Sequence, residues 1–142
     1  MATIYIMRGL PGSGKSTIAK QLSGTVVSAD LFFINEDGEY VHDRSKIGAA
    51  HAWCQAQCRH LMLQGEDVIV DNTNVHRWEF QYYLNFAEEF GYNVSIIHVG
   101  TVLSIHELGE RNTHGVPTDI IARMGDSFEY EWETCDPNNP YE

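Results

Sequence analysis

Positively charged side chains are scarce in this chain of 142 residues. Nine lysines and arginines stand against twenty aspartates and glutamates, which gives a net charge of −11. The second half is the more acidic, because residues 72–142 carry 3 basic and 12 acidic side chains. Such a chain has no general electrostatic surface for long nucleic acids. A polyanionic ligand would therefore have to be bound by a few specific cations.

Long apolar runs and a cysteine framework are also missing. No stretch approaches the roughly 20 apolar residues that a membrane span needs, so we expect no membrane association. Three cysteines, an odd number, do not make a disulfide framework. The opening residues "MATIYIM" lack the basic segment and apolar run of a signal peptide, so we expect a cytoplasmic protein. The 43% of hydrophobic residues is enough for one globular domain with a single core.

Short β-branched runs alternate with helical patterns along the chain, which predicts an α/β fold with a parallel sheet and helices on both faces. The predicted strands are residues 3–8, 25–30, 67–73 and 92–100. The predicted helices are residues 15–22, 44–63, 77–90, 104–112 and 118–128. A turn signal at Asp37-Gly38 indicates a small hairpin or lid between the second strand and the next helix.

Ligands of such sheets bind beyond the carboxyl ends of the strands. Polar residues or glycines follow each predicted strand, and we expect them to converge on one cleft. They are Arg8 and Gly9, Asp30, residues 71–74, and Gly100.

The stretch "RGLPGSGKST", residues 8–17, follows the first strand and opens the first helix. Gly9, Gly14, Lys15 and Ser16 match the phosphate-binding pattern G-x-x-x-x-G-K-[ST]. Backbone N–H groups of such a loop approach the β-phosphate, the lysine neutralises the β/γ oxygens, and the serine hydroxyl is a Mg²⁺ ligand. A Gly-rich turn with no ligand is the alternative. The residues expected to contact ATP are Gly9, Pro11, Gly12, Ser13, Gly14, Lys15, Ser16 and Thr17 of this loop, together with Arg111 and Arg123 further along the chain.

Two aspartates at strand ends are candidates for the chemistry. Asp71 ends the strand "VIVD", where a carboxylate commonly holds the metal or its water, so Ser16 and Asp71 form the predicted Mg²⁺ site. Asp30 ends the second predicted strand and could take the proton of a hydroxyl acceptor as general base. The alternatives are an acid that caps a turn for Asp71, and a solvated or capping acid for Asp30.

The motifs occur together in a known order. They are "RGLPGSGKST" (8–17), "SADLFF" (28–33), "AHAW" (50–53), "DNTN" (71–74), "WE" (78–79) and "RNTHGV" (111–116). This set resembles the polynucleotide 5′-hydroxyl kinase group of P-loop kinases, and within it the small kinase-like ATPase domain of ubiquitin-ligase-binding proteins. The resemblance covers roughly residues 3–130.

The resemblance implies a single P-loop kinase domain over residues 1–142, with 131–142 as an irregular tail. It implies a three-layer P-loop NTPase fold with a parallel four- to five-stranded sheet of adenylate-kinase type. Lys15 and Ser16 would hold ATP and Mg²⁺, and Asp30 would be the general base. Arg111 would lie in a lid over the nucleotide, with Arg123 on the adjoining helix. Phe33 departs from the bacteriophage polynucleotide kinase of this group, which has an arginine at that position. The lid around His114-Gly115 is also shorter than the lid of that kinase.

Phosphoryl transfer needs positive charge on the developing oxygens, and the chain has six arginines. Arg111 is the strongest candidate for a catalytic arginine, with a surface salt bridge to Glu107 or Glu110 as the alternative. Arg77 could face the acceptor.

Three further patterns each have a structural and a functional interpretation. His51, Cys54, Cys58 and His60 could suggest zinc, but three of them share the apolar stripe of one helix, where cysteine packs as a small hydrophobe. The aromatic residues of helix 77–90 could stack on bases, and are mostly expected in the core, with Trp78 as the one closest to the acceptor. The six acids after residue 125 form either a solvated face or an interaction tail.

The leading hypothesis is a kinase that transfers the γ-phosphoryl group of ATP to a hydroxyl acceptor. The acceptor would be a polynucleotide 5′-end, a modified DNA base, a nucleoside or a small metabolite. An ATP-binding or ATP-hydrolysing regulatory protein that works through a protein partner is the alternative.

Overall fold

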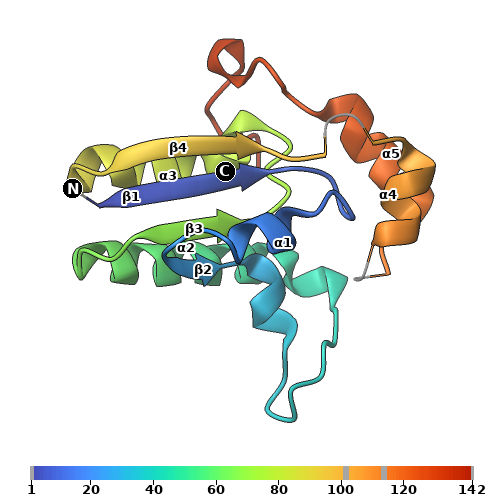
Figure 1. The fold of residues 1–142 in the computed structure, drawn as a ribbon, viewed down its shortest axis with the longest axis horizontal. Helices are drawn as coiled ribbons and strands as arrows, with labels where there is room; N and C mark the ends of the chain where they lie inside the picture. Colours follow the sequence, from blue (N-terminus) through green and yellow to red (C-terminus); the bar gives the residue numbers. More distant parts are fainter. Residues whose placement is uncertain (1, 101–102, 113–114, 142) are drawn as a thin grey trace.

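A four-stranded parallel sheet forms the centre of the protein, seen in a computed structural model that describes residues 2–100, 103–112 and 115–141 (Figure 1). The strands are β1 (Thr3–Arg8), β2 (Thr25–Val27), β3 (Val68–Asp71) and β4 (Asn93–His98), in the order β2-β3-β1-β4. Every residue of β3 is buried, as expected of a central parallel strand covered on both faces. The predicted α/β class and parallel sheet are confirmed, with four strands.

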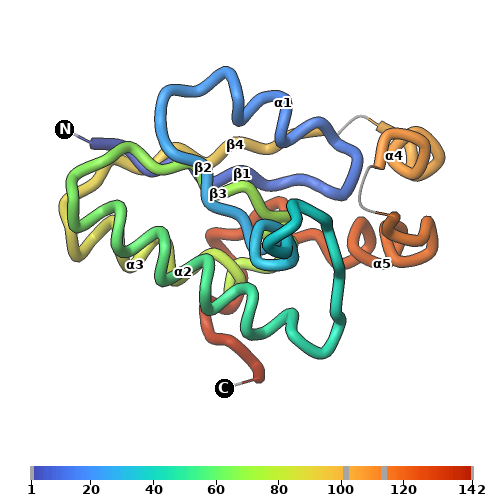
Figure 2. The backbone as a smooth tube through the Cα atoms, turned by 90° about the horizontal axis from the view of Figure 1, so that it is seen from below, coloured from blue at the N-terminus to red at the C-terminus, as the bar shows by residue number. Residues whose placement is uncertain are grey.

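Helices cover both faces of the sheet and its carboxyl edge. α1 (Lys15–Ala19) lies on one face, whereas α2 (Ile47–Leu63) and α3 (Arg77–Phe90) lie on the other (Figure 2). α4 (Ile105–Arg111) and α5 (Thr118–Ser127) lie beyond the carboxyl ends of the strands (Figures 1 and 2). Among the helices described, none is long and apolar enough to cross a membrane.

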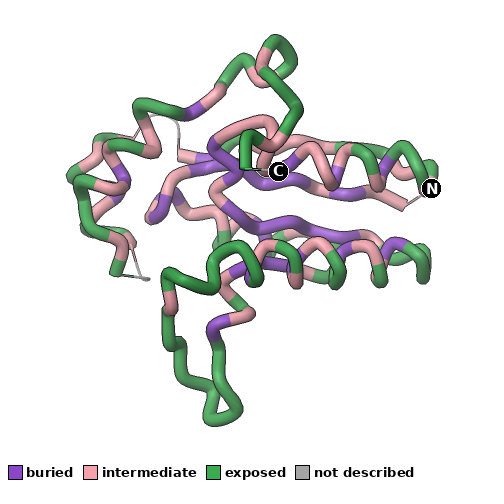
Figure 3. Tube along the Cα trace, turned by 180° about the vertical axis from the view of Figure 1, so that it is seen from behind, coloured by how far each residue is buried: buried purple, intermediate pink, exposed green. Residues whose placement is uncertain are grey.

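The larger core lies between the sheet and the α2–α3 layer, and the smaller one lies under α1 (Figure 3). Cys54 and Cys58 are fully buried in the larger core, which confirms their packing role. The bounds of α3 agree with the prediction, but its buried face consists of Phe80, Tyr83 and Ala87, whereas Trp78 is half-buried. The side of α3 that contains Trp78 is therefore partly exposed to solvent.

The second strand is shorter than predicted. β2 ends at Val27, and residues Ala29–Phe33 form a 3₁₀ helix whose first N–H groups are capped by the hydroxyl of Ser28, which accepts from the Asp30 N–H. The prediction of a strand through Asp30 is wrong, because this polar cap turns the chain before Asp30. The predicted hairpin is present: Ile34 and Tyr40 form an antiparallel bridge around a turn with Gly38 at φ 81°.

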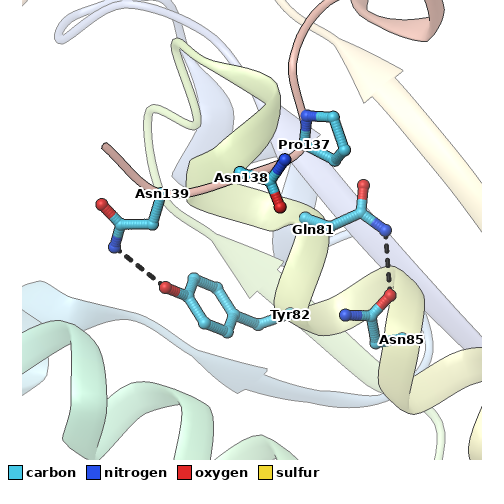
Figure 4. Close-up of a pocket in the computed structure, with 6 residues that line it drawn as sticks. All are labelled: Gln81, Tyr82, Asn85, Pro137, Asn138 and Asn139. Carbon is cyan, nitrogen blue, oxygen red and sulfur yellow. Dashed lines mark hydrogen bonds between the residues drawn. The ribbon is translucent and has the colours of Figure 1, made fainter. Parts of the chain in front are cut away.

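The C-terminal segment has little regular structure, as predicted, apart from a 3₁₀ turn at Trp132–Thr134. Arg77 fastens it to α3, because its guanidinium donates to the backbone oxygens of Glu133 (3.1 Å) and Cys135 (3.0 Å). Further along, the Asn139 amide donates to the Tyr82 hydroxyl at 2.9 Å, at the edge of a polar pocket (Figure 4). Arg77 therefore holds this segment against α3. That Arg77 also faces an acceptor stays a prediction.

Candidate functional site

The phosphate-loop motif forms a tight turn between β1 and α1. Gly14 precedes α1 in the left-handed region at φ 99°, which an L side chain rarely adopts. The Lys15 ammonium donates to the Leu10 carbonyl oxygen at 3.2 Å, so the side chain folds back over the loop. Burial lowers the pKa of Lys15, while the carboxylates of Asp71 and Asp30 act in the opposite direction. The buried Lys15 ammonium is therefore within electrostatic reach of two carboxylates, those of Asp71 and Asp30.

Ser16 and Asp71 meet at the start of α1. The Ser16 hydroxyl donates to the Asp71 Oδ2 oxygen at 2.9 Å, and Asp71 is buried at the end of β3. Hydroxyl and carboxylate oxygens are ligands that suit Mg²⁺. The two residues of the predicted Mg²⁺ site are thus brought together, and their role as its ligands stays a prediction.

Asp30 lies in the 3₁₀ helix Ala29–Phe33, which follows β2. The Tyr40 hydroxyl, across the hairpin, is 3.4 Å from the Asp30 Oδ1 oxygen. The sequence motifs do not point to Tyr40, although the Asp37-Gly38 turn places it opposite Ile34. Phe33, where the phage kinase has an arginine, is buried and packs against Tyr40 with 6.2 Å between ring centroids. Phe33 therefore supports the hairpin that carries Tyr40.

His51, which the zinc interpretation included, lies on α2 beside the cleft. Burial lowers the pKa of its imidazole, while Glu79 and Asp30 raise it. His51 is thus within electrostatic reach of both carboxylates.

The motif "DNTN" ties the strand ends together. The Asn72 Oδ1 oxygen accepts from the Ala29 N–H at 2.9 Å, and the Asn74 amide donates to the Met7 carbonyl at 2.8 Å. Thr73 offers its carbonyl to the Gly9 N–H at 3.1 Å. Gly100 packs against Ser13 of the phosphate loop. The expected convergence of the strand ends is therefore present.

Helix α4 lies directly on the phosphate loop. A Cβ atom added at Gly12 would come within 2.1 Å of the Leu108 carbonyl oxygen, so α4 contacts the loop backbone itself. A Cβ at Gly14 would meet an Arg111 guanidinium nitrogen at 3.2 Å, which places this guanidinium over the loop. The expected lid residues 113–114 lie outside the described part of the chain.

Arg123 is placed elsewhere. It lines a groove of about 350 Å³ between the segment that follows β3 and helix α5, which we name the α3–α5 groove. Residues Thr73, His76, Trp78, Arg123, Met124 and Tyr141 are among those that line it. The structure thus brings Arg111 to the phosphate loop and Arg123 to this neighbouring groove.

Arg8, the first residue of the motif stretch, is fully buried, which the motif did not suggest. Its guanidinium donates to the carbonyl oxygens of Asn74 (2.8 Å) and Val75 (2.9 Å) and lies 4.7 Å from the Phe80 ring centroid and 4.5 Å from that of Phe128. Burial lowers the pKa of Arg8 to about 10, so it stays charged at neutral pH. Arg8 fixes the segment after β3 at the floor of the α3–α5 groove.

Known proteins share this sequence pattern. The family model described as "AAA domain" matches residues 4–130. Human NEDD4-binding protein 2 is 35% identical over 135 residues, which are 89% of this chain and 8% of that protein. The 2′,3′-cyclic-nucleotide 3′-phosphodiesterase of Pongo abelii is 28% identical over 140 residues, 92% of this chain and 32% of that protein. The chain thus spans a small part of both relatives.

The fold is also shared with a solved structure. A chain in the structure of the Pnkp1/Rnl/Hen1 RNA repair complex superposes with a TM-score of 0.74 at 22% identity, over 96% of this chain and 47% of that one. At this identity the likeness concerns the fold, which is the P-loop, kinase-like α/β fold that the motifs predicted.

Proposed function

Because this chain belongs to the family described as "AAA domain" and has its P-loop, kinase-like fold, we propose that it is an ATP-dependent phosphotransferase. It moves the γ-phosphoryl group of ATP to the hydroxyl of a polynucleotide 5′-end, a modified DNA base or a nucleoside. The observation that supports the proposal is the hydrogen bond between Ser16 and Asp71 at the phosphate loop, with Asp30 within electrostatic reach of the loop lysine. A hydrolase could activate water there, and the labelled-acceptor assay described below distinguishes the two reactions.

Each of these residues has a distinct task in the proposed reaction. The residues of the loop from Gly9 to Thr17 bind the phosphates, and Lys15 neutralises charge on the β- and γ-oxygens. Ser16 and Asp71 would hold Mg²⁺, whose bound charge further neutralises the phosphates. Arg111, which lies over the loop, stabilises charge on the equatorial oxygens of the transferred group.

The bond changes balance without a further reactant. The acceptor oxygen forms a bond to the γ-phosphorus as the bond from that phosphorus to the β–γ bridging oxygen breaks, and ADP leaves. Asp30 takes the proton of the acceptor hydroxyl in the transition state and later releases it to solvent. The whole of residues 1–142 acts as one kinase domain in this proposal.

The test is transfer of label from γ-labelled ATP to a panel of 5′-hydroxyl oligonucleotides, hydroxymethylated DNA, nucleosides and sugars. Wild type should label one class, and Asp30→Asn should lower kcat by about 10²–10⁴-fold while Mg·ATP binding persists, because a general base contributes this much. Asp37→Asn, an exposed carboxylate in the same hairpin, is the matched control and should transfer normally. ATP binding with hydrolysis but no labelled acceptor would instead identify the regulatory ATPase.

A further inference from the structure

The α3–α5 groove lies next to the transfer site. Its floor begins at Thr73, two residues after Asp71, and the Thr73 carbonyl accepts from the Gly9 N–H at 3.1 Å. Arg8 holds the next two carbonyl groups of this floor, those of Asn74 and Val75. A molecule in the groove is therefore held against the same backbone that shapes the phosphate loop.

One wall of the groove is aromatic. The rings of His76 and Trp78 stack with centroids 5.7 Å apart and planes at 18°, and the Tyr141 ring packs against Trp78 at 5.7 Å and 70°. Glu79 fixes His76, because its carboxylate accepts from the His76 N–H at 2.8 Å and lies 2.9 Å from Nδ1. Trp78 is thus held in place on one side, while it remains half-buried at the groove.

The opposite wall supplies a cation. Arg123 reaches the groove from α5, its side chain is 75% exposed, and its ion pair with Asp119 spans 3.6 Å. Exposed ion pairs of this kind contribute little, so the guanidinium can exchange Asp119 for an anionic ligand. Guanidinium groups bind phosphate oxygens through paired hydrogen bonds.

From this combination we propose that the α3–α5 groove binds the terminal nucleobase of the acceptor. The base stacks on the aromatic wall of Trp78 and Tyr141, and Arg123 binds the phosphate on the 3′ side of the terminal nucleoside. The inference rests on the proposed phosphotransferase function and narrows its substrate to nucleobase-bearing acceptors. It also explains how a chain with a net charge of −11 could hold a nucleic-acid end, since stacking contributes affinity without charge.

The groove is tested by binding, separately from phosphate transfer. The probe is a 5′-hydroxyl tetranucleotide with a 3′ fluorophore, titrated by fluorescence anisotropy in the presence of a nonhydrolysable ATP analogue. Stacking of one base is worth about 1–3 kcal/mol, so Trp78→Ala should weaken binding about tenfold, whereas Trp78→Phe should stay within about threefold of wild type. Tyr130→Ala, an exposed aromatic that lies outside the groove lining, is the matched control and should bind as wild type does.

A probe without its 5′-terminal base provides an independent test of the groove. A tetranucleotide that lacks its 5′-terminal base should bind wild type about tenfold more weakly, and Trp78→Ala should cause no further loss with this probe. Competition by a nucleoside 3′-monophosphate distinguishes a free nucleotide from a polynucleotide end, since the polynucleotide adds contacts beyond the groove. Because Tyr141 is 85% exposed, Tyr141→Ala cannot unfold the protein, and it should weaken binding about threefold by loss of the outer ring.

The outcomes separate the two proposals. Equal affinity of wild type and Trp78→Ala, or no effect of the missing base, would overturn the groove as a base site even if the oligonucleotide is phosphorylated. If Mg·ATP binds but no acceptor is labelled, the transferase proposal fails by its own assay. Unchanged melting temperature and Mg·ATP affinity of each variant establish that a loss of oligonucleotide binding is local.

Discussion

Substitution of Arg111 can separate two effects, the stabilisation of charge in the transition state and the binding of ATP. Its guanidinium lies over Gly14, and the side chain is exposed, so its removal leaves the core intact. We expect Arg111→Ala to lower kcat by about 10²–10³-fold, because a lost donor to the transition-state oxygens costs this much. The KM for ATP should change by less, since Lys15 and the loop backbone still bind the phosphates.

Single-turnover transfer of labelled phosphate measures this effect. Arg59→Ala is the control, because Arg59 is an exposed arginine on α2 that pairs with Glu89 away from the cleft. If Arg111→Ala turned over like Arg59→Ala, α4 would not act as a catalytic lid.

His51 gives the protein a pH-dependent stability. Burial keeps the pKa of His51 in the folded protein below the ordinary value of 6.5, so the unfolded chain takes up the proton first as the pH falls. The free energy of unfolding is therefore unaffected by His51 above about pH 6.5 and decreases as the pH falls from there toward the lower folded pKa. His98, whose pKa burial also lowers, contributes with the same sign.

Denaturant unfolding at pH values between about 7.5 and 5 measures this dependence for wild type and His51→Gln. The variant should lose less stability over this range. His60→Gln, an exposed histidine on the same helix, should follow wild type. A variant His51→Gln with the wild-type slope would show that His51 is not held neutral.

At the residue scale, local motifs predicted the site better than they predicted its supports. Lys15 and Ser16 belong to a phosphate loop that is encoded within a few adjacent residues. Asp71 meets Ser16 because the carboxyl ends of the paired parallel strands β1 and β3 lie side by side. Tyr40 and Arg8 could not be predicted. Their partners, Asp30 across a hairpin and the backbone of residues 74–75, are brought near only by the tertiary fold.

At the scale of elements, the contact of α4 with the phosphate loop depends on Gly12. Its φ is 83°, and a Cβ atom added there would overlap the Leu108 carbonyl oxygen, so there is no space for a side chain. We expect Gly12→Ala to push α4 away from the loop and to lower turnover at least tenfold. The positive φ adds a backbone strain of about 1–3 kcal/mol.

Gly65→Ala separates the two causes, because Gly65, which follows α2, has a φ of 76° but no atom within 4 Å of an added Cβ. Thermal unfolding should show a similar backbone penalty in both variants, and the transfer assay should show a defect in Gly12→Ala alone. Equal turnover of the two variants would mean that close docking of α4 is not needed.

The elements themselves were predicted where periodicity is strong and local. The bounds of α3 follow from its aromatic pattern and from Gly91 at its end, where φ is 70°. The buried face of α3 could not be predicted from the sequence, because Phe80, Tyr83 and the half-buried Trp78 are all large aromatic residues. Only the packing of α3 on the sheet determines which of them is buried. β2 was predicted too long, since the cap by Ser28 competes with the strand.

At the scale of the whole molecule, the order β2-β3-β1-β4 brings the polar strand ends to one edge, as alternation of strands and helices predicts. The α3–α5 groove could not be predicted in this way. Its walls come from the segment after β3, from α5 and from Tyr141, which are far apart in the sequence and meet through the Arg8 and Arg77 contacts.

The charge of the whole molecule predicts how acceptor binding responds to salt. Affinity for single-stranded nucleic acid falls with log[salt] with a slope of about −0.7 for each phosphate neutralised. With a net charge of −11 and Arg123 as the cation in the groove, we expect one or two phosphates to be bound and a slope near −1. The measurement is the affinity for the labelled tetranucleotide without ATP between about 50 and 300 mM NaCl. Arg123→Gln should make the slope less negative by about 0.7, which is the contribution of one phosphate contact. Lys20→Gln, an exposed lysine on the α1 side of the sheet, should leave the slope unchanged. A slope of −3 or steeper would require several phosphate contacts and would contradict recognition through a stacked base and a single arginine.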